Sequence, residues 1–249
     1  MTRTVLITGA AVRIGRALAE TLARAGWDVI VHARSSAAQA DELCGRLRAL
    51  GRQAWRVSGD LLAPRGPDGV FADAVAAAGR VDALVNNAAA FERVPLSEAA
   101  PEDFDRLWRL NALAPIRLTQ RLHAHLSARG ARGCAVNLLD QRIAQPCADA
   151  IPYLLSKKAL EAFTLSAARE LAPTLRVNAV APGAVLTPPD AAAREPAGAF
   201  PTGARPTPDQ VAEAVGYLLS ADAVTGQILF VDGGQHLISP QASSPSPKP

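Results

Sequence analysis

Short apolar or β-branched runs alternate along this chain with longer stretches rich in Ala, Leu and Arg, and this alternation restricts the fold more than any other feature. Runs of four or five residues fit strands, whereas apolar residues spaced three and four apart fit helices that cover them. The apolar runs lie at residues 5–8, 29–32, 54–57, 82–86, 134–138, 176–180 and 228–231. Because strands that alternate with helices form βαβ units, we predict an α/β fold: a Rossmann-type doubly wound sheet of about seven parallel strands flanked by helices.

The chain length and composition favour one domain. With 249 residues, 49% of them hydrophobic, the chain can bury one sizeable core, which we expect to span residues 1–238. Residues 239–249 are rich in Pro and Ser, so we expect a disordered C-terminal tail. Residues 183–208 are rich in Pro, Ala and Gly and show weak periodicity, which fits either a mobile loop near a binding site or a surface insertion.

Charge and cysteine usage exclude several function classes. The net charge is +3, but no run of Lys or Arg is interleaved with aromatic residues, so we expect no nucleic-acid partner. No segment is apolar enough to cross a membrane, and the chain enters a strand within three residues of Met1 instead of a signal peptide. Cys44, Cys134 and Cys147 lack metal-ligand spacing. They predict reduced thiols in a cytoplasmic protein without a metal site.

Two glycines follow the first predicted strand. Gly9 comes directly after it, and Gly15 lies six residues further on, where a helix begins. Glycine lets the backbone approach a pyrophosphate closely, and a helix N-terminus offers it free N–H groups and a partial positive charge. The pattern therefore predicts a dinucleotide-binding loop, although a tight turn between a strand and a helix remains an alternative.

Tyr153 and Lys157 lie four residues apart in a stretch whose apolar spacing predicts a helix through Leu171. Four residues put both side chains on one face of that helix. An ammonium group near a phenol stabilises the tyrosinate and lowers its pKa from about 10, so Tyr153 could donate a proton to a substrate. The alternative is a packing Tyr beside a surface Lys. The chain uses Arg for nearly every cation, its only lysines being Lys157, Lys158 and Lys248, which favours a specific role for Lys157.

The motifs together resemble the short-chain dehydrogenase/reductase family over residues 4 to about 237. The matching segments are TGAAVRIG at 8–15, Asn86-Asn87-Ala88, Asn111, Tyr153 with Lys157, and NAVAPG at 178–183. The resemblance implies an oxidoreductase that transfers hydride, assembles as a homotetramer and uses Asn111 to hold a water beside Lys157. It also implies a set of cofactor-binding residues: Gly9, Arg13, Ile14, Gly15, Asp60, Leu61, Asn87, Ala88, Tyr153, Lys157, Pro182 and Gly183.

The end of the second strand predicts which cofactor is used. No acidic residue stands there to bind ribose hydroxyls, and the chain offers Arg34, Ser35 and Ser36 instead. An Arg flanked by hydroxyl groups suits a 2′-phosphate, so we predict NADPH. The alternative is a solvated Arg34 at a helix start with Ser36 as the N-cap.

Three residues depart from the broad family in one direction, toward its pteridine reductase branch. Arg13 replaces the usual middle glycine, and its guanidinium could bridge the cofactor phosphate and a ligand. Asp140 stands 13 residues before Tyr153, where the family usually has Ser, and a carboxylic acid can relay a proton to a ring nitrogen. The alternative is that Asp140 caps a loop in a degenerate dehydrogenase. Phe91 is either a platform for a flat ligand or a residue that fills the core.

We therefore predict an NADPH-dependent oxidoreductase that resembles pteridine reductases and reduces dihydropterins of the biopterin, monapterin or folate type. Tyr153, Lys157, Asp140 and Asn111 would be its catalytic residues. The substrate, a small molecule, would contact Arg13, Phe91, Asp140 and Tyr153. One alternative is a carbonyl reductase that acts on a 3-oxoacyl thioester or another ketone, for which Ser would suit position 140 better. Another is an NADP-binding regulator without turnover.

Overall fold

The computed structural model describes residues 2–146, 148–186 and 200–238, and these form a single parallel sheet with helices on both faces. The seven strands have the order β3-β2-β1-β4-β5-β6-β7, so the predicted Rossmann-type doubly wound sheet is confirmed. Their bounds are β1 Thr4–Ile7, β2 Asp28–Ala33, β3 Ala54–Ser58, β4 Ala83–Asn86, β5 Gly133–Leu138, β6 Leu175–Pro182 and β7 Ile228–Val231. Each strand overlaps one of the predicted apolar runs.

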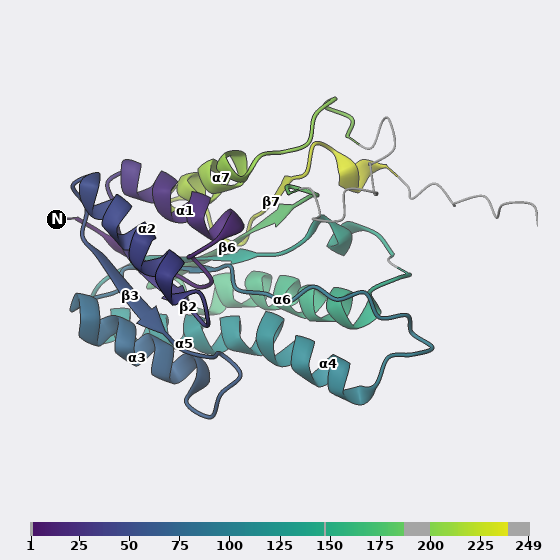
Figure 1. Cartoon of the computed structure of the whole chain (residues 1–249), viewed down its shortest axis with the longest axis horizontal. Helices are drawn as coiled ribbons and strands as arrows, with labels where there is room; N and C mark the ends of the chain where they lie inside the picture. Colours follow the sequence, from purple (N-terminus) through teal and green to yellow (C-terminus); the bar gives the residue numbers. More distant parts are fainter. Residues whose placement is uncertain (1, 147, 187–199, 239–249) are drawn as a thin grey trace, which may run out of the picture.

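Two layers of helices enclose the sheet (Figure 1). Helices α1 (Arg13–Arg24), α2 (Ala37–Ala49) and α7 (Pro208–Ser220) cover one face. The other face is covered by α3 (Gly66–Ala78), α4 (Pro101–Trp108), α5 (Ala114–Ala128) and α6 (Ile151–Glu170). A π-helical segment η1 (Arg109–Leu113) joins α4 to α5, and short 3₁₀ segments η2 (Gln141–Ala144) and η3 (Gln235–Leu237) follow β5 and β7.

Successive side chains of the central strands belong to two hydrophobic clusters, one on each face of the sheet. In β1, Val5 and Ile7 pack among residues of α1, α2 and α7, whereas Leu6 packs among residues of α3 and α5. This follows from the period of two residues in a strand, which sends successive side chains to opposite faces. The central strands such as β1 and β4 are buried on both faces, so their apolar runs in the sequence are nearly continuous, whereas the edge strands β3 and β7 are only partly buried.

The strand order reverses between β1 and β4, where the sheet has its topological switch point. Strand β1 pairs with β2 on one side and with β4 on the other, all in parallel. In open α/β sheets a crevice forms at this point beyond the carboxyl ends of the strands, and ligands bind there. The segments that leave β1, β2, β4, β5 and β6 meet at this edge, and they carry nearly all the residues singled out from the sequence.

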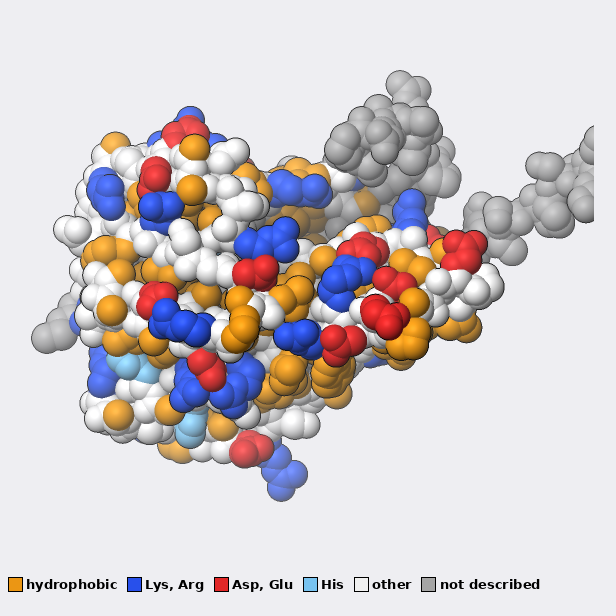
Figure 2. All heavy atoms as spheres, turned by 60° about the horizontal axis from the view of Figure 1, so that its bottom comes forward, with side chains coloured by type: hydrophobic (Ala, Val, Ile, Leu, Met, Phe, Trp, Pro, Cys, Tyr) orange, Lys and Arg blue, Asp and Glu red, His pale blue; other side chains and the backbone are white. Residues whose placement is uncertain are grey.

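The predictions for residues 183–208, the C-terminal tail and the cysteines can be compared with the structure only where it describes those residues. Residues 183–186 and 200–207 form no helix or strand, but residues 187–199 of the same segment lie outside the described residues, as do Cys147 and the predicted tail at 239–249. Cys44 and Cys134 are buried free thiols. Within the described chain, none of the helices combines the length and the apolar character that crossing a membrane requires. Figure 2 shows basic and acidic side chains interspersed on the visible face.

Candidate active site

Tyr153 and Lys157 lie on α6, one turn apart, and both side chains are buried. Lys157 is only 3% exposed and donates a hydrogen bond of 2.7 Å from Nζ to the carbonyl oxygen of Leu138, the last residue of β5. The same nitrogen lies 5.9 Å from the ring centroid of Tyr153. Burial lowers the pKa of Lys157 to about 8, against an opposing effect of the Asp140 carboxylate. Lys157 is therefore not a surface Lys, whereas Lys158 lies at the surface and pairs with Glu161.

Asp140 lies between Tyr153 and the first turn of η2. The Tyr153 hydroxyl donates to Oδ2 of Asp140 over 2.9 Å. The other carboxylate oxygen accepts the backbone N–H of Arg142 over 2.8 Å, as in an N-cap, and the Arg142 guanidinium lies 3.3 Å from Oδ2. Asp140 thus caps a short helix, which was the alternative interpretation, and contacts the candidate proton donor at the same time.

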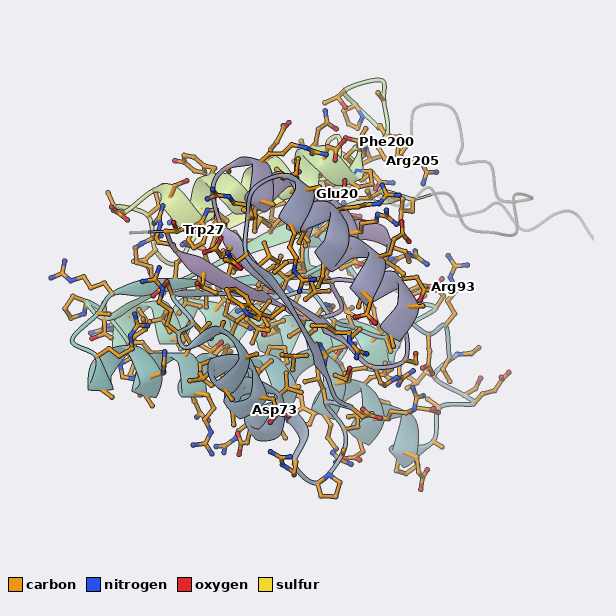
Figure 3. The ribbon with its side chains drawn as sticks, turned by 60° about the vertical axis from the view of Figure 1, so that its left-hand side comes forward. Glu20, Trp27, Asp73, Arg93, Phe200 and Arg205 are labelled. Carbon is orange, nitrogen blue, oxygen red and sulfur yellow. The ribbon has the colours of Figure 1, made fainter. Side chains whose placement is uncertain are left out.

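Phe91 forms one wall beside this pair. It is 45% exposed, and its ring meets that of Tyr153 edge to face at a centroid distance of 4.8 Å. The Arg142 guanidinium lies 4.9 Å from the Phe91 centroid, and that of Arg93 lies 5.8 Å away. Arg93, labelled in Figure 3, also pairs with Asp149 over 3.1 Å. Phe91 therefore does not fill the core, and nearly half of its surface is exposed beside Tyr153.

Asn111 fixes the loop that carries Phe91. It is fully buried in the π-helical segment η1, where its Oδ1 accepts the N–H of Ala90 and its Nδ2 donates to the carbonyl of Ala90, both over 2.9 Å. The second Nδ2 hydrogen points to the hydroxyl of Ser156 on α6, 3.1 Å away. Both amide hydrogens are thus used in joining the β4 loop to α6. The predicted water beside Lys157 is not tested by these contacts and stays a prediction.

The glycine loop after β1 is packed too tightly for side chains. A Cβ on Gly15 would lie 2.1 Å from the Gly9 carbonyl oxygen, and Gly9 itself has a φ of +62°. Arg13 has a φ of +55° at the start of α1, an uncommon conformation for a residue other than glycine. Its side chain is exposed at the helix N-terminus together with the half-buried Ile14. The first N–H groups of α1 therefore face the edge of the sheet beside a guanidinium.

The segment after β4 binds this loop directly. Asn87 Nδ2 donates to the carbonyl oxygens of Thr8, over 2.8 Å, and Gly9, over 3.1 Å. The Thr8 hydroxyl accepts the backbone N–H groups of Asn87 and Ala88, each over 3.0 Å. The ends of β1 and β4 are therefore joined across the switch point, with Ala88 against Gly9.

The ends of β2 and β3 place polar groups further along the same edge. Arg34 and Ser35 are exposed after β2, and Ser36 occupies the N-cap position of α2 without a capping hydrogen bond from its side chain. Ser36 is thus the N-cap residue, as the alternative interpretation has it, but its side chain makes no capping hydrogen bond. After β3, Asp60 accepts the N–H of Leu62 over 2.9 Å, while Leu61 is buried in the core.

Pro182 is the last residue of β6, and Gly183 follows it directly. Gly183 lies against the C-terminal segment, since an added Cβ would be 2.7 Å from the Cβ of Asp232 and 2.5 Å from Oε1 of Gln235. The same Gln235 oxygen accepts the N–H of Ala184 over 2.9 Å. The structure describes this segment only as far as Leu186.

Sequence reasoning missed three residues that shape the site: Thr8, His32 and Arg142. Arg142 carried a usable signal, because it lies two residues after Asp140 in a chain segment expected to turn. Thr8 directly precedes Gly9, and its hydroxyl is the acceptor for the β4 loop. His32 ends a buried apolar run, where a lone His is usually a core residue without further meaning. Nothing in the sequence distinguishes His32 from such a core histidine.

Three comparisons with known proteins agree on the family. A family model described as enoyl-(acyl carrier protein) reductase matches residues 9–236. The "Granaticin polyketide synthase putative ketoacyl reductase 2" of Streptomyces violaceoruber is 34% identical over 94% of this chain and 96% of its own. The short-chain dehydrogenase/reductase eriH of Hericium erinaceus is 32% identical over 92% of this chain and 96% of its own.

A solved structure is equally similar. The crystal structure of FolM alternative dihydrofolate reductase 1 from Brucella canis, complexed with NADP, matches with a TM-score of 0.89 and 32% identity, covering 96% of both chains. Fold, motifs and relatives together define the class: the chain belongs to the short-chain dehydrogenase/reductase family of oxidoreductases.

Proposed function

We propose that this protein is an NADPH-dependent reductase of dihydropterins, similar to pteridine reductases. The observation that carries the proposal is the 2.9 Å hydrogen bond from the Tyr153 hydroxyl to the Asp140 carboxylate. It puts an anionic acceptor next to the proton donor, at the position where a substrate must be held. A ring that presents N–H groups satisfies such an acceptor, whereas a carbonyl oxygen is repelled by it.

The residues at the sheet edge fit a bound dinucleotide. Gly9 and Gly15 allow close backbone approach, and the first N–H groups of α1 suit a pyrophosphate. We propose that Arg34, Ser35 and Ser36 bind the 2′-phosphate, that Asp60 and Leu61 lie at the adenine, and that Asn87 and Ala88 lie by the nicotinamide ribose. Pro182 and Gly183 would border the nicotinamide. The NADP bound by the similar FolM structure supports this choice of cofactor.

The proposed mechanism divides the reduction between cofactor and protein. NADPH supplies the hydride when it is bound. Tyr153 gives the matching proton from its hydroxyl to the reduced substrate. Lys157 keeps the resulting phenolate stable, because its buried ammonium lies near the ring, 5.9 Å from the centroid. Its bond to the Leu138 carbonyl holds the ammonium in place.

Substrate binding falls to four side chains in this proposal. Phe91 would stack on a flat ring, since it is half-exposed beside Tyr153. Asp140 would accept N–H groups of the ring and is kept in position by Arg142. Arg13, exposed at the start of α1, would bridge the cofactor phosphate and the ligand. Asn111 contributes by fixing Ala90, next to Phe91.

Substituting Asp140 by Ser tests the proposal. The Asp140→Ser variant should lose turnover of dihydrobiopterin while binding NADPH as the unmodified protein does. A hydroxyl at this position orients a ketone, so any turnover of an acetoacetyl thioester should rise. Retained or improved pterin turnover in the variant would refute the role of Asp140.

A ketone reductase is the second candidate function. The granaticin relative, whose printed name describes a ketoacyl reductase, favours it. The carboxylate of Asp140 argues against it, because the developing oxyanion of a ketone would lie beside a negative charge. A regulator without turnover fits less well, since the Tyr153, Lys157 and Asn111 set is complete. Tight NADPH binding without oxidation by any pterin or ketone would favour the regulator.

We further propose that the protein is a homotetramer located in the cytoplasm. Large apolar side chains are exposed on α4, η1 and α6, including Trp108, Leu113, Leu155 and Leu165, which suits contacts between copies. The buried free thiols of Cys44 and Cys134 suit a reducing compartment. Light scattering coupled to gel filtration tests the assembly, and cell fractionation tests the location.

A further inference from the structure

His32 is a buried titratable residue to which the proposed mechanism gives no role. It lies near the carboxyl end of β2 and is only 2% exposed. The adjacent residues of its own face, such as Ile30, are aliphatic and belong to the core. A polar ring at such a place costs stability unless both nitrogens have partners.

Both ring nitrogens bind the backbone of segments that flank the proposed dinucleotide site. Gly9, in the glycine loop after β1, donates its N–H to Nδ1 over 3.3 Å. Nε2 lies 3.0 Å from the carbonyl oxygen of Gly59, directly before Asp60. Since Gly9 can only donate, Nδ1 is the acceptor and Nε2 carries the hydrogen that the Gly59 carbonyl accepts. The backbone carbonyl of His32 also accepts the N–H of Ala10 over 2.9 Å.

This bonding pattern requires a neutral ring. A protonated imidazole would present a second N–H to the N–H of Gly9, so that two donors would face each other. Burial lowers the pKa of His32, against smaller opposing effects of the Gly59 carbonyl and the Asp60 carboxylate. The ring is therefore neutral at neutral pH and suited to its two partners.

Gly9 is held from its other side as well. Its carbonyl oxygen accepts a hydrogen bond from Asn87 Nδ2 over 3.1 Å and lies only 2.1 Å from where a Cβ on Gly15 would be. With its N–H committed to His32, Gly9 cannot donate to a phosphate. Its contribution is the shape of the loop, which His32 on β2 and Asn87, directly after β4, hold through hydrogen bonds.

We propose that His32 is a positioning residue. It holds the glycine loop, through Gly9, and the segment after β3, through Gly59, in one arrangement before the dinucleotide binds. The inference rests on the proposed cofactor site and adds a residue that does not touch the cofactor. Loops that are already ordered lose less entropy on binding, so a ring that joins them raises affinity for the cofactor. It does not take part in the proton transfer, which occurs at Tyr153.

The test compares variants of the full chain for NADPH affinity and for turnover. His32→Leu removes both hydrogen bonds and is expected to raise the Kd and KM for NADPH about tenfold, with kcat at saturating NADPH nearly unchanged. His32→Gln can still accept and donate, and should recover part of the affinity. Ile30→Val is the matched control, because it alters a buried residue on the same face of β2 without touching either loop.

Hydrogen exchange gives a readout that does not depend on the cofactor. In the cofactor-free protein, exchange of the peptide that contains Gly9 should be faster in His32→Leu than in Ile30→Val. If His32→Leu does not fold, His32→Asn takes its place, since its shorter amide cannot reach both loops. A folded variant with unchanged NADPH affinity and unchanged exchange at Gly9 would overturn the proposal. Failure of the unmodified protein to bind NADPH would instead refute the proposed function, while the exchange comparison would still test His32.

Discussion

The Tyr153 hydroxyl donates a hydrogen bond to the Asp140 carboxylate, 2.9 Å away. Arg142 holds the same carboxylate from the other side through its backbone N–H and its guanidinium. In the proposed function, a substrate with N–H groups takes over this acceptor, whereas the oxygen of a ketone meets a negative charge. This relationship, more than the Tyr and Lys alone, favours a nitrogen heterocycle over a ketone.

Replacing Tyr153 by Phe should abolish the proton donation and leave the cofactor site intact. We expect kcat for dihydropterin reduction to fall about 10²- to 10⁴-fold, the usual contribution of a general acid. The Kd for NADPH should change little, as measured by fluorescence titration. Tyr217→Phe, at an exposed position on α7, is the control. Turnover above a tenth of the unmodified rate in Tyr153→Phe would show that another group supplies the proton.

The rate of reduction should fall as the pH rises above about 8. Burial lowers the pKa of Lys157 from 10.5 to about 8, so the ammonium is present below this pH and lost above it. Folding stability responds in the opposite sense, because the unfolded chain binds this proton up to a higher pH, and the contribution of Lys157 to stability rises between these values. Deprotonation of Lys157 therefore does not by itself destabilise the fold in this window.

The pH profile of kcat/KM, together with a denaturation midpoint at each pH, tests this assignment. Lys158→Ala should keep the same descending limb, since Lys158 lies at the surface beside Glu161. A profile that stays flat to pH 10 would contradict a functional role for the Lys157 ammonium.

Reversing the charge at position 34 should change the cofactor preference. Arg34→Asp puts a carboxylate where the 2′-phosphate would lie, so we expect NADPH to bind about tenfold to a hundredfold more weakly while NADH is little affected. Parallel titrations with both cofactors measure this. Arg52→Asp, at a site bonded to the carbonyl of Gly26, controls for the change in net charge. Equal affinities for NADPH and NADH in the unmodified protein would contradict the cofactor assignment.

Phe91→Ala should weaken pterin binding specifically. Loss of the aromatic surface is expected to raise the KM for dihydropterin roughly tenfold, because an aromatic stacking pair contributes about 0.5–1.5 kcal/mol beyond its buried area. Stability should change little, as the side chain is 45% exposed. Tyr217→Ala, another exposed aromatic residue, is the control. An unchanged KM would mean that the ring does not stack on Phe91.

Most of the fold could be predicted from the sequence because buried parallel strands are nearly continuous apolar runs. The run at 228–231 coincides with β7, and the others differ from their strands by a few residues at the ends. Thr8 shows the cause of such differences. It continues the apolar run of β1, but its hydroxyl accepts N–H groups from the β4 segment, so it belongs to the loop.

The candidate site was predictable where spacing along one element sets the geometry. Tyr153 and Lys157 share a face of α6 because they lie four residues apart. Contacts between distant segments were harder to foresee. The sequence around His32 does not indicate that its ring bonds to Gly9 and Gly59, and the sequence around Asn111 does not indicate that it bonds to Ala90. These contacts depend on the pairing of strands and the placement of helices. Asp140 illustrates a further difficulty, since it caps η2 and also contacts Tyr153, so the cap does not exclude the proposed role in the site.

Steady-state NADPH oxidation by the purified protein tests the central claim most directly. Dihydrobiopterin, dihydromonapterin and dihydrofolate should be assayed in parallel with an acetoacetyl thioester. We predict turnover confined to the pterins. Turnover confined to the thioester would contradict the roles given to Arg13, Phe91 and Asp140, and would leave a ketone reductase that uses Tyr153 and Lys157.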